Sequence, residues 1–188
     1  MNTLLLFVGV AAILALALQR QEAQATPTAP GSAQPPPPAP FYAAGRLNAK
    51  QRDAADIIIE AAQAAGMNPA FMIALAVTES SLGLFESGDA GKSLGLFQLK
   101  LATARDYEPT ITTGELFDAT INARIAMKHL GSLMRQFPGG TAADYAQAWA
   151  LGGDGYFKQG KRLPAKVNAL DRAILDLNLD LSINEVLT

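Results

Sequence analysis

Glu79 is the residue whose type and spacing most directly suggest chemistry. Met72, Leu75, Ala76 and Glu79 follow one another at i, i+3, i+4 and i+7, so in a helix they share one face. A carboxylate at the end of an apolar face loses part of its hydration, which raises its pKa. A carboxylic acid that stays protonated near neutral pH can donate a proton to the leaving oxygen of a glycosidic bond. The alternative is an ordinary glutamate that turns into solvent at the helix end.

A glycine-rich polar segment follows this helix. Residues 88–95, GDAGKSLG, are free to bring backbone amides close to a ligand. They lead into residues 95–98, GLFQ, and then to Thr103 and Ala104. A glycine turn that carries an aromatic ring and an amide suits a sugar, because sugars bind through hydrogen bonds to amides and by stacking on ring faces.

Four short motifs occur in a fixed order along the chain. They are Glu79-Ser80, GLFQ at residues 95–98 with Thr103-Ala104 beyond it, Asp118 with Asn122, and Ala148-Trp149 with Gly152. Together they resemble the signature of the Slt-type lytic transglycosylases, a family similar in fold to the goose-type lysozymes. The resemblance covers about residues 45–175 and implies a mainly α-helical, lysozyme-like domain that acts on the glycan strands of peptidoglycan.

The resemblance also implies a non-hydrolytic reaction. Glu79 would protonate the leaving oxygen of the β-1,4 bond from N-acetylmuramic acid to N-acetylglucosamine. It would then take a proton from the muramoyl 6-hydroxyl, which closes on C1 and gives a 1,6-anhydro end. One carboxylate serves as acid and then as base, so neither a metal nor a cofactor is required.

The family motifs carry over a set of substrate-binding positions. These positions are Ser80, Leu96, Phe97, Gln98 and Trp149. Ser80 is expected chiefly to support the helix end and the orientation of Glu79, whereas Gln98 and the backbone around Leu96 and Phe97 would hold N-acetyl and hydroxyl groups.

Two positions depart from the family pattern. Trp149 stands where the family carries tyrosine, and Ala150 stands where it carries asparagine, so a phenol and an amide are lost from the site. Trp149 can still stack on a sugar ring. Tyr145 or Tyr156 could return a hydroxyl group to the substrate.

Two other functions remain open from the sequence. Glu86 or Asp89 could position a water molecule for an inverting muramidase, which needs its two carboxylates about 6.5–9.5 Å apart. The third hypothesis is a catalytically weak module that binds peptidoglycan in a secretion apparatus or a phage virion. The altered Trp149-Ala150 pair would be the feature that indicates it.

The elements that must hold these residues read as helices. The predicted helix starts are Asn48 with Gln51, Asn68-Pro69, Asp118, Thr141 and Pro164, and Ser182 with Glu185 predicts a short C-terminal helix. No alternating strand pattern stands out, although a short hairpin between Phe85 and Gln98 is compatible with the sequence. The fold class is therefore mainly α.

The N-terminal part has a different composition from the rest. Residues 4–18 are an unbroken apolar run whose helix would be about 22 Å long, short of a hydrocarbon core of roughly 30 Å. We expect residues 1–22 to be a membrane anchor that leaves the domain facing the periplasm or cell wall, with a secretory signal cleaved near Ala25 as the alternative. Residues 23–43 read as a proline- and alanine-rich linker, and residues 44–188 as the folded domain.

Composition excludes several classes of site. The sequence has no cysteine and one histidine, His129, which argues against thiolate chemistry, a histidine-based zinc site and a Ser-His-Asp triad. Its formal net charge is -2 and it has no basic run, so we expect no nucleic-acid partner. The expected partners are peptidoglycan strands, a membrane through residues 4–18, and a larger envelope-spanning or virion assembly.

Overall fold

The computed structural model describes residues 43–187 and confirms a mainly helical domain. The elements follow in this order: η1 (Ala44–Arg46), α2 (Ala49–Ala64), α3 (Pro69–Ser80), β1 (Ser87–Gly88), η2 (Asp89–Gly91), β2 (Ser93–Leu94), β3 (Leu99–Lys100), α4 (Leu101–Arg105), η3 (Glu115–Phe117), α5 (Ala119–Gln136), α6 (Ala142–Leu151), η4 (Asp154–Lys158) and α7 (Pro164–Leu177).

The five major helices begin where the sequence predicts. Asn48 and Gln51 form a reciprocal capping box at α2, and Thr141 with Asp144 forms another at α6. The side chains of Asn68 and Asp118 accept hydrogen bonds from the first backbone N–H groups of α3 and α5, and Pro164 opens α7. Local capping chemistry therefore explains the helix starts.

The predicted C-terminal helix after Ser182 is wrong. The backbone N–H of Glu185 donates to the carbonyl of Ser182, but only a single turn forms. The carbonyls of Ile183 and Glu185 instead accept from the N–H groups of Ala143 and Ala142, at the free amino end of α6. These two N–H groups have no partner within α6. By bonding the tail they hold it in a non-helical conformation at the amino end of α6.

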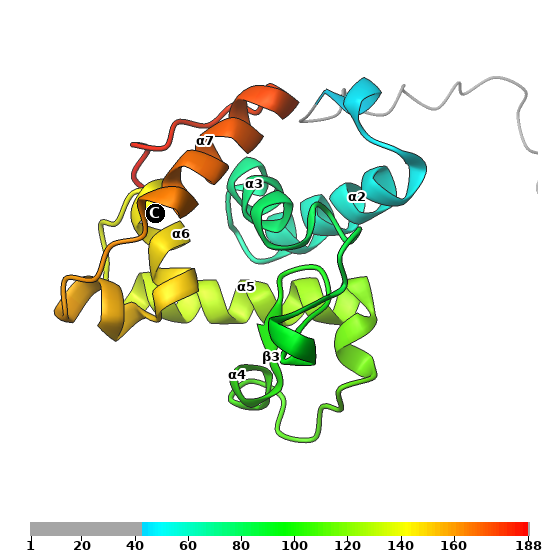
Figure 1. Cartoon of the computed structure of the whole chain (residues 1–188), viewed down its shortest axis with the longest axis horizontal. Helices are drawn as coiled ribbons and strands as arrows, with labels where there is room; N and C mark the ends of the chain where they lie inside the picture. Colours follow the sequence, from blue (N-terminus) through cyan, green and yellow to red (C-terminus); the bar gives the residue numbers. More distant parts are fainter. Residues whose placement is uncertain (1–42, 188) are drawn as a thin grey trace, which may run out of the picture. The chain divides into compact units, whose positions relative to one another are not determined.

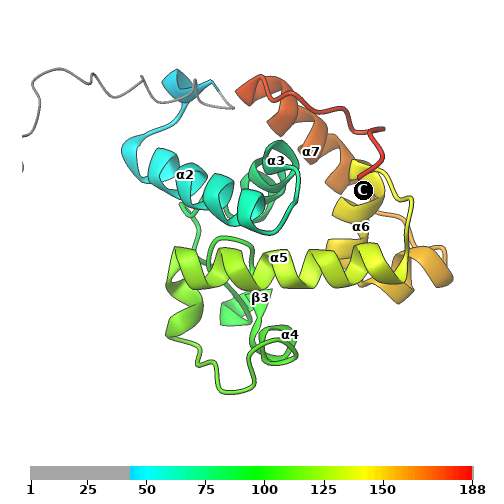
Figure 2. The same cartoon turned by 180° about the vertical axis from the view of Figure 1, so that it is seen from behind.

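Helix α3 is the centre of the domain. It lies between α2 and α7 and above the long helix α5, as both views show (Figure 1, Figure 2). All of its residues from Ala70 to Ala76 are buried, because a helix that is apolar on every side has no face to give to solvent. Its position fixes where its last residues, including Glu79, can lie.

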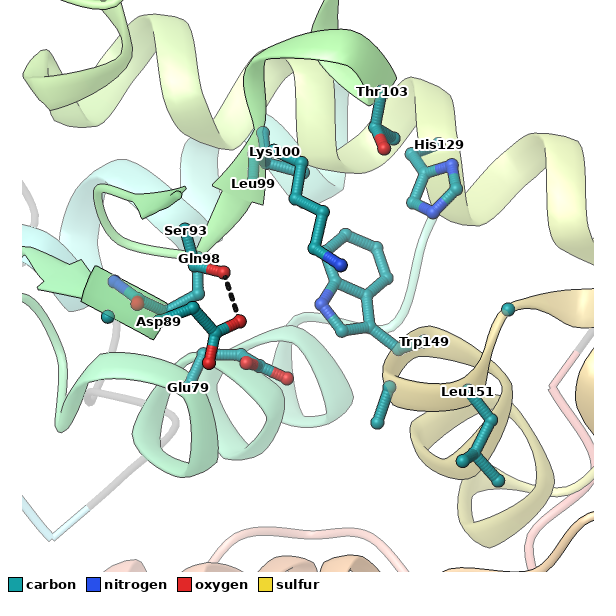
Figure 3. Close-up of a pocket in the computed structure, with 13 residues that line it drawn as sticks. Glu79, Asp89, Ser93, Gln98, Leu99, Lys100, Thr103, His129, Trp149 and Leu151 are labelled. Atoms are coloured by element: carbon teal, nitrogen blue, oxygen red, sulfur yellow. Dashed lines mark hydrogen bonds between the residues drawn. The ribbon is translucent and has the colours of Figure 1, made fainter. Parts of the chain in front are cut away.

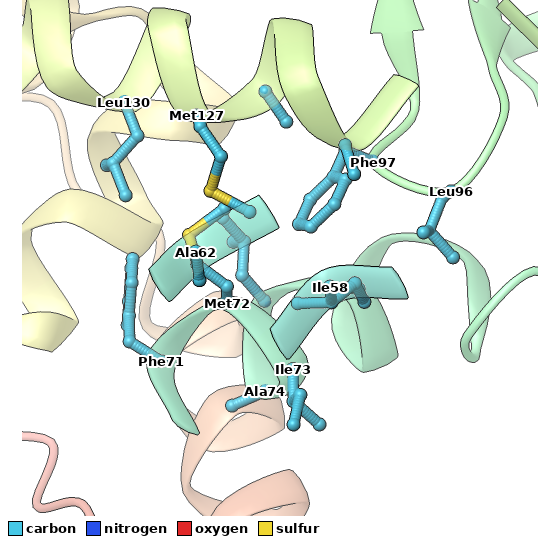
Figure 4. Close-up of a cluster of buried hydrophobic side chains, with 14 of the residues drawn as sticks. Ile58, Ala62, Phe71, Met72, Ile73, Ala74, Leu96, Phe97, Met127 and Leu130 are labelled. Atoms are coloured by element: carbon cyan, nitrogen blue, oxygen red, sulfur yellow. The ribbon is translucent and has the colours of Figure 1, made fainter. Parts of the chain in front are cut away.

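Large side chains from α2, α3 and α5 fill the space around this helix (Figure 4). Phe71 and Met72 of α3 meet Met127 and Leu130 of α5, and Ile58 of α2 closes the cluster. Burying a side chain of this size is worth about 1.5–3 kcal/mol. The core thus anchors the first turn of α3 against its neighbours.

A small antiparallel sheet lies between α3 and α5 in the chain. Its three strands run in the order β1-β2-β3, so the region compatible with a hairpin holds two short hairpin connections. Asn122 of α5 is fully buried and bonds this region through its side chain. Its Oδ1 accepts from the N–H of Phe97 at 2.9 Å, and its Nδ2 donates to the carbonyls of Leu94 at 3.0 Å and Leu116 at 2.8 Å.

The expectations for residues 1–22 and for most of the linker at residues 23–43 lie outside the described residues. Within residues 43–187, every helix is too short or too polar to cross a membrane.

Replacing Asn122 with alanine should destabilise the domain by about 3 kcal/mol, because one buried N–H and two buried carbonyls lose their partner. The measurement is urea unfolding followed by circular dichroism. Asn168→Ala, on the exposed side of α7, is the control and should change the free energy of unfolding by less than about 0.5 kcal/mol. Equal effects of the two substitutions would contradict the structural role of Asn122.

Candidate active site

Glu79 lies in the last turn of α3, where the helix ends abruptly. Ser81 and Leu82 take left-handed backbone conformations, with φ of 53° and 56°. The hydroxyl of Ser80, which is buried, donates to the carbonyl of Leu96 at 2.6 Å and accepts from the N–H of Gly83 at 2.9 Å. Ser80 therefore ties the end of α3 to the GLFQ turn and holds the segment that carries Glu79. It is not among the residues that line the pocket described next.

An open pocket of about 660 Å³ lies beside Glu79 (Figure 3). It draws its walls from α3, the small sheet, α4, α5 and α6. The lining residues are Glu79, Gly88, Asp89, Ser93, Gln98, Leu99, Lys100, Thr103, His129, Trp149, Ala150, Leu151 and Gly152. Three of the four motifs that led to the family thus contribute residues to one cavity.

The environment of Glu79 favours the protonated acid, although one cation opposes it. The side chain is only 15% exposed, and this burial raises the pKa of Glu79 above its ordinary value. The ammonium of Lys166 donates to Oε1 of Glu79 at 2.5 Å and lowers the pKa, whereas the charge of Asp89 raises it. Burial dominates, so the net direction is upward.

The two other acids considered from the sequence have different positions. Asp89 lines the pocket, and its Oδ2 accepts a hydrogen bond from the hydroxyl of Ser93 at 2.9 Å. Glu86 does not line the pocket and pairs with Lys50 at 2.5 Å on the surface. Only Asp89 of these two can therefore act on a ligand in this cavity.

The GLFQ turn is built from residues with different functions. Gly95 has a φ of +70°, and a Cβ there would lie 2.1 Å from the carbonyl oxygen of Leu116, so only glycine fits. Gln98 lines the pocket, and its Nε2 donates to the carbonyls of Gly95 at 2.9 Å and Phe85 at 3.2 Å. These bonds orient the amide, and Gly88 leaves room for its Oε1.

The structure corrects the expectation for Leu96 and Phe97. Both side chains are buried in the core and neither lines the pocket. One backbone group of each is also occupied, because the carbonyl of Leu96 accepts from Ser80 and the N–H of Phe97 donates to Asn122. They shape the turn from beneath and do not contact the cavity.

Trp149 forms the aromatic wall of the pocket. Its ring meets the ring of His129 edge-on, with centroids 4.9 Å apart, and lies 6.1 Å from that of Phe97. Nδ1 of His129 is 3.1 Å from the hydroxyl of Tyr107, and burial lowers the pKa of His129, which favours the neutral ring. This packing holds Trp149 half-buried with part of its surface toward the cavity.

Tyr145 and Tyr156 do not reach the pocket, which corrects the expectation that one of them supplies a hydroxyl there. Tyr145 is fully buried, and its hydroxyl donates to the carbonyl of Phe137 at 2.7 Å. The hydroxyl of Tyr156 donates to Asp144 at 2.5 Å, beneath the amino end of α6. Both phenols are used to join α6 to its neighbours.

The sequence patterns did not predict that two lysines, Lys100 and Lys166, belong to the site. Lys100 extends into the cavity beside Trp149 (Figure 3). Lys166 reaches Glu79 from α7, across a separation of 87 residues. Periodicity and motifs carry no information on such a distant pair, and the only local signal is a lysine in the first turn of a helix, where a cation is disfavoured.

Residues 43–187 contain no group of three or more histidine or acidic side chains that could hold a metal ion. The pocket offers one largely buried carboxyl group, a second carboxylate, an oriented amide and an aromatic wall. This set can donate a proton to a bound sugar and hold its hydroxyl and acetamido groups.

Comparison with known proteins supports this interpretation. No curated protein matches the chain in sequence. The family described as "Transglycosylase SLT domain" matches residues 56–162, which include Glu79, the small sheet, α5, α6 and the whole pocket. The chain therefore belongs to the SLT transglycosylase family, whose domain implies cleavage of peptidoglycan by the transglycosylase type of reaction.

Proposed function

We propose that the protein is a lytic transglycosylase that cleaves the bond from N-acetylmuramic acid to N-acetylglucosamine and leaves 1,6-anhydromuramoyl ends. The observation that carries this proposal is the position of Glu79, a largely buried carboxyl with a raised pKa at the edge of an open, aromatic-walled pocket. Membership of the SLT family supports the reaction type.

In the first step, protonated Glu79 donates its proton to the glycosidic oxygen as the C1–O bond breaks. The N-acetylglucosamine portion leaves with that proton, and positive charge develops at C1 of the muramoyl unit. Glu79, now a carboxylate, then removes the proton of the 6-hydroxyl while O6 bonds to C1. The acid is regenerated, and no water molecule is consumed.

The walls of the pocket suit the binding of this substrate. Trp149 offers a ring face for stacking, and Gln98 with Ser93 and Thr103 offers polar groups to hydroxyl and acetamido substituents. Because Ala150 has no polar side chain, Gln98 is the only side-chain amide among the residues that line this pocket.

Muropeptide analysis tests the reaction directly. We expect the protein to release anhydromuramoyl fragments from purified sacculi, and Glu79→Gln to lower their release by at least about a thousandfold because an amide is far too weak an acid to protonate the leaving oxygen. Mass spectrometry distinguishes anhydro from reducing ends. Glu86→Gln is the matched control, since that carboxylate lies outside the pocket, and should leave the products unchanged.

Reducing ends in place of anhydro ends would contradict the proposal. Sacculi that bind the protein but release no fragments would also contradict it, in favour of a binding module.

Binding can be followed through Trp149, which is the only tryptophan of the chain. We expect oligomers of N-acetylglucosamine to shift the fluorescence of Glu79→Gln protein, and Trp149→Ala to weaken their binding in calorimetry about tenfold because a stacking surface is lost. Cello-oligosaccharides of equal length, which lack acetamido groups, are the control ligand. An unchanged affinity in Trp149→Ala would remove Trp149 from the binding site.

An inverting muramidase is the second candidate. Its second carboxylate would be Asp89 and not Glu86, because only Asp89 lines the pocket. Asp89 would activate a water molecule while Glu79 acts as the acid. We expect instead that Asp89→Asn keeps its anhydro products. Because the charge of Asp89 raises the pKa of Glu79, its removal should move the alkaline limb of activity to lower pH.

The pH dependence of product release from sacculi checks this expectation, with Asp180→Asn as an exposed control. Incorporation of ¹⁸O from labelled water into the products, abolished by Asp89→Asn, would establish the muramidase instead.

A further inference from the structure

The ion pair between Lys166 and Glu79 is unusual in this domain because it is buried. Nζ of Lys166 lies 2.5 Å from Oε1 of Glu79, and the two side chains are only 10% and 15% exposed. The pair between Lys50 and Glu86 is equally short but lies on the surface, with exposures of 57% and 47%. Surface pairs of that kind contribute little to folding, whereas a buried pair must overcome the loss of hydration of both groups.

The position of Lys166 on α7 adds a second cost. Lys166 lies in the first turn of this helix, where the helix dipole disfavours a positive charge. The ammonium of Lys166 donates its hydrogen bond to the carboxylate of Glu79.

The placement of α7 does not depend on the ion pair. Leu170, Ile174 and Leu177 bury the inner face of α7 in the core, and α7 packs against both α3 and α6. The backbone N–H of Leu163 donates to Oε1 of Gln147 at 2.9 Å, which fixes the entry to the helix. Lys166 is therefore carried to Glu79 by a helix that other contacts hold.

We propose that Lys166 is a positioning residue for the general acid of this enzyme: it holds one oxygen of Glu79, leaves the other for proton transfer, and stabilises the carboxylate that forms. This inference rests on the proposed function. The match to the SLT family ends at residue 162, so the family assignment gives Lys166 no function.

The chemistry of the first step explains why an ammonium is useful there. Burial alone makes Glu79 a reluctant donor, because the charged form left after proton transfer is poorly solvated. As the proton leaves, negative charge develops on the carboxylate, and a preorganised cation in a partly dry site stabilises that charge. Lys166 thus has two opposing effects: it lowers the fraction of Glu79 that is protonated, and it makes the protonated Glu79 a stronger acid.

The other charges that face Glu79 act in both directions. Asp89 of η2 raises its pKa, whereas Lys166 of α7 lowers it. Lys100 of β3 and His129 of α5 line the same pocket, and burial keeps His129 toward its neutral form. Removing the charge of Lys166 leaves burial and Asp89 unopposed by this close cation, so the pKa of Glu79 must rise.

The test compares Lys166→Met, which keeps an unbranched side chain as far as Cε and removes the charge, with Lys166→Arg, which keeps the charge. We expect the alkaline limb of kcat/KM for Lys166→Met to move up by about one pH unit or more, and its plateau to fall about tenfold. Lys166→Arg should restore the limb to within about 0.3 unit of the unmodified protein. Lys50→Met removes an equally short surface pair and should leave the whole profile unchanged.

A titration by ¹³C NMR of the Glu79 carboxyl group, assigned by its loss in Glu79→Gln, tests the pair without turnover. Its midpoint should rise in Lys166→Met and also in a second uncharged variant, Lys166→Gln. This readout separates the two proposals, because it applies even to a protein that releases no fragments.

An unchanged midpoint in both uncharged variants would overturn the inference. So would an equal loss of activity in Lys166→Arg and Lys166→Met with no displacement of the pH profile, since that result would mean a packing contribution alone.

Discussion

A carboxyl group at the end of an apolar helix is the constraint on which this structure depends. Helix α3 is buried on all sides from Ala70 to Ala76, where α2, α5 and α7 surround it, and the enclosure opens near its carboxyl end. Glu79 lies at that opening, with protein on one side and the pocket on the other. The packing that stabilises the domain is therefore also what dehydrates the acid and raises its pKa.

The segment beyond α3 must turn sharply to form the opposite wall of the pocket. Six residues other than glycine have positive φ within residues 43–187, and five of them lie between Ser81 and Gln98. Such conformations cost about 1 kcal/mol or more each, so surrounding contacts must over-determine them. Ser80 and Asn122 supply part of these contacts through buried hydrogen bonds to Gly83, Leu94, Leu96 and Phe97, which explains why motif residues that do not line the pocket still shape it.

Local signals in the sequence predicted the helices well, and distant contacts were beyond them. Caps such as Asn48 and Thr141 bind backbone groups within three residues, so the start of a helix is legible from a short window. Tyr145 and Trp149 are one helical turn apart on α6, yet the first is buried under η4 and the second faces the pocket. Only the packing of α6 against its neighbours decides between these outcomes, and the same holds for the pairing of Lys166 with Glu79.

Trp149 and Ala150 bring neither a phenol nor a carboxamide to the pocket, whereas Lys166 brings an ammonium group to Glu79. A neutral phenol or amide can orient a carboxyl group while changing its charge balance little, whereas an ammonium orients it and strengthens it as an acid at once. The orientation of Glu79 and its acid strength are then coupled. Both depend on the 2.5 Å contact between Nζ of Lys166 on α7 and Oε1 of Glu79 on α3. Any displacement of α7 changes the two together, so the rigid packing of Leu170, Ile174 and Leu177 serves the chemistry of Glu79 as well as the stability of the fold.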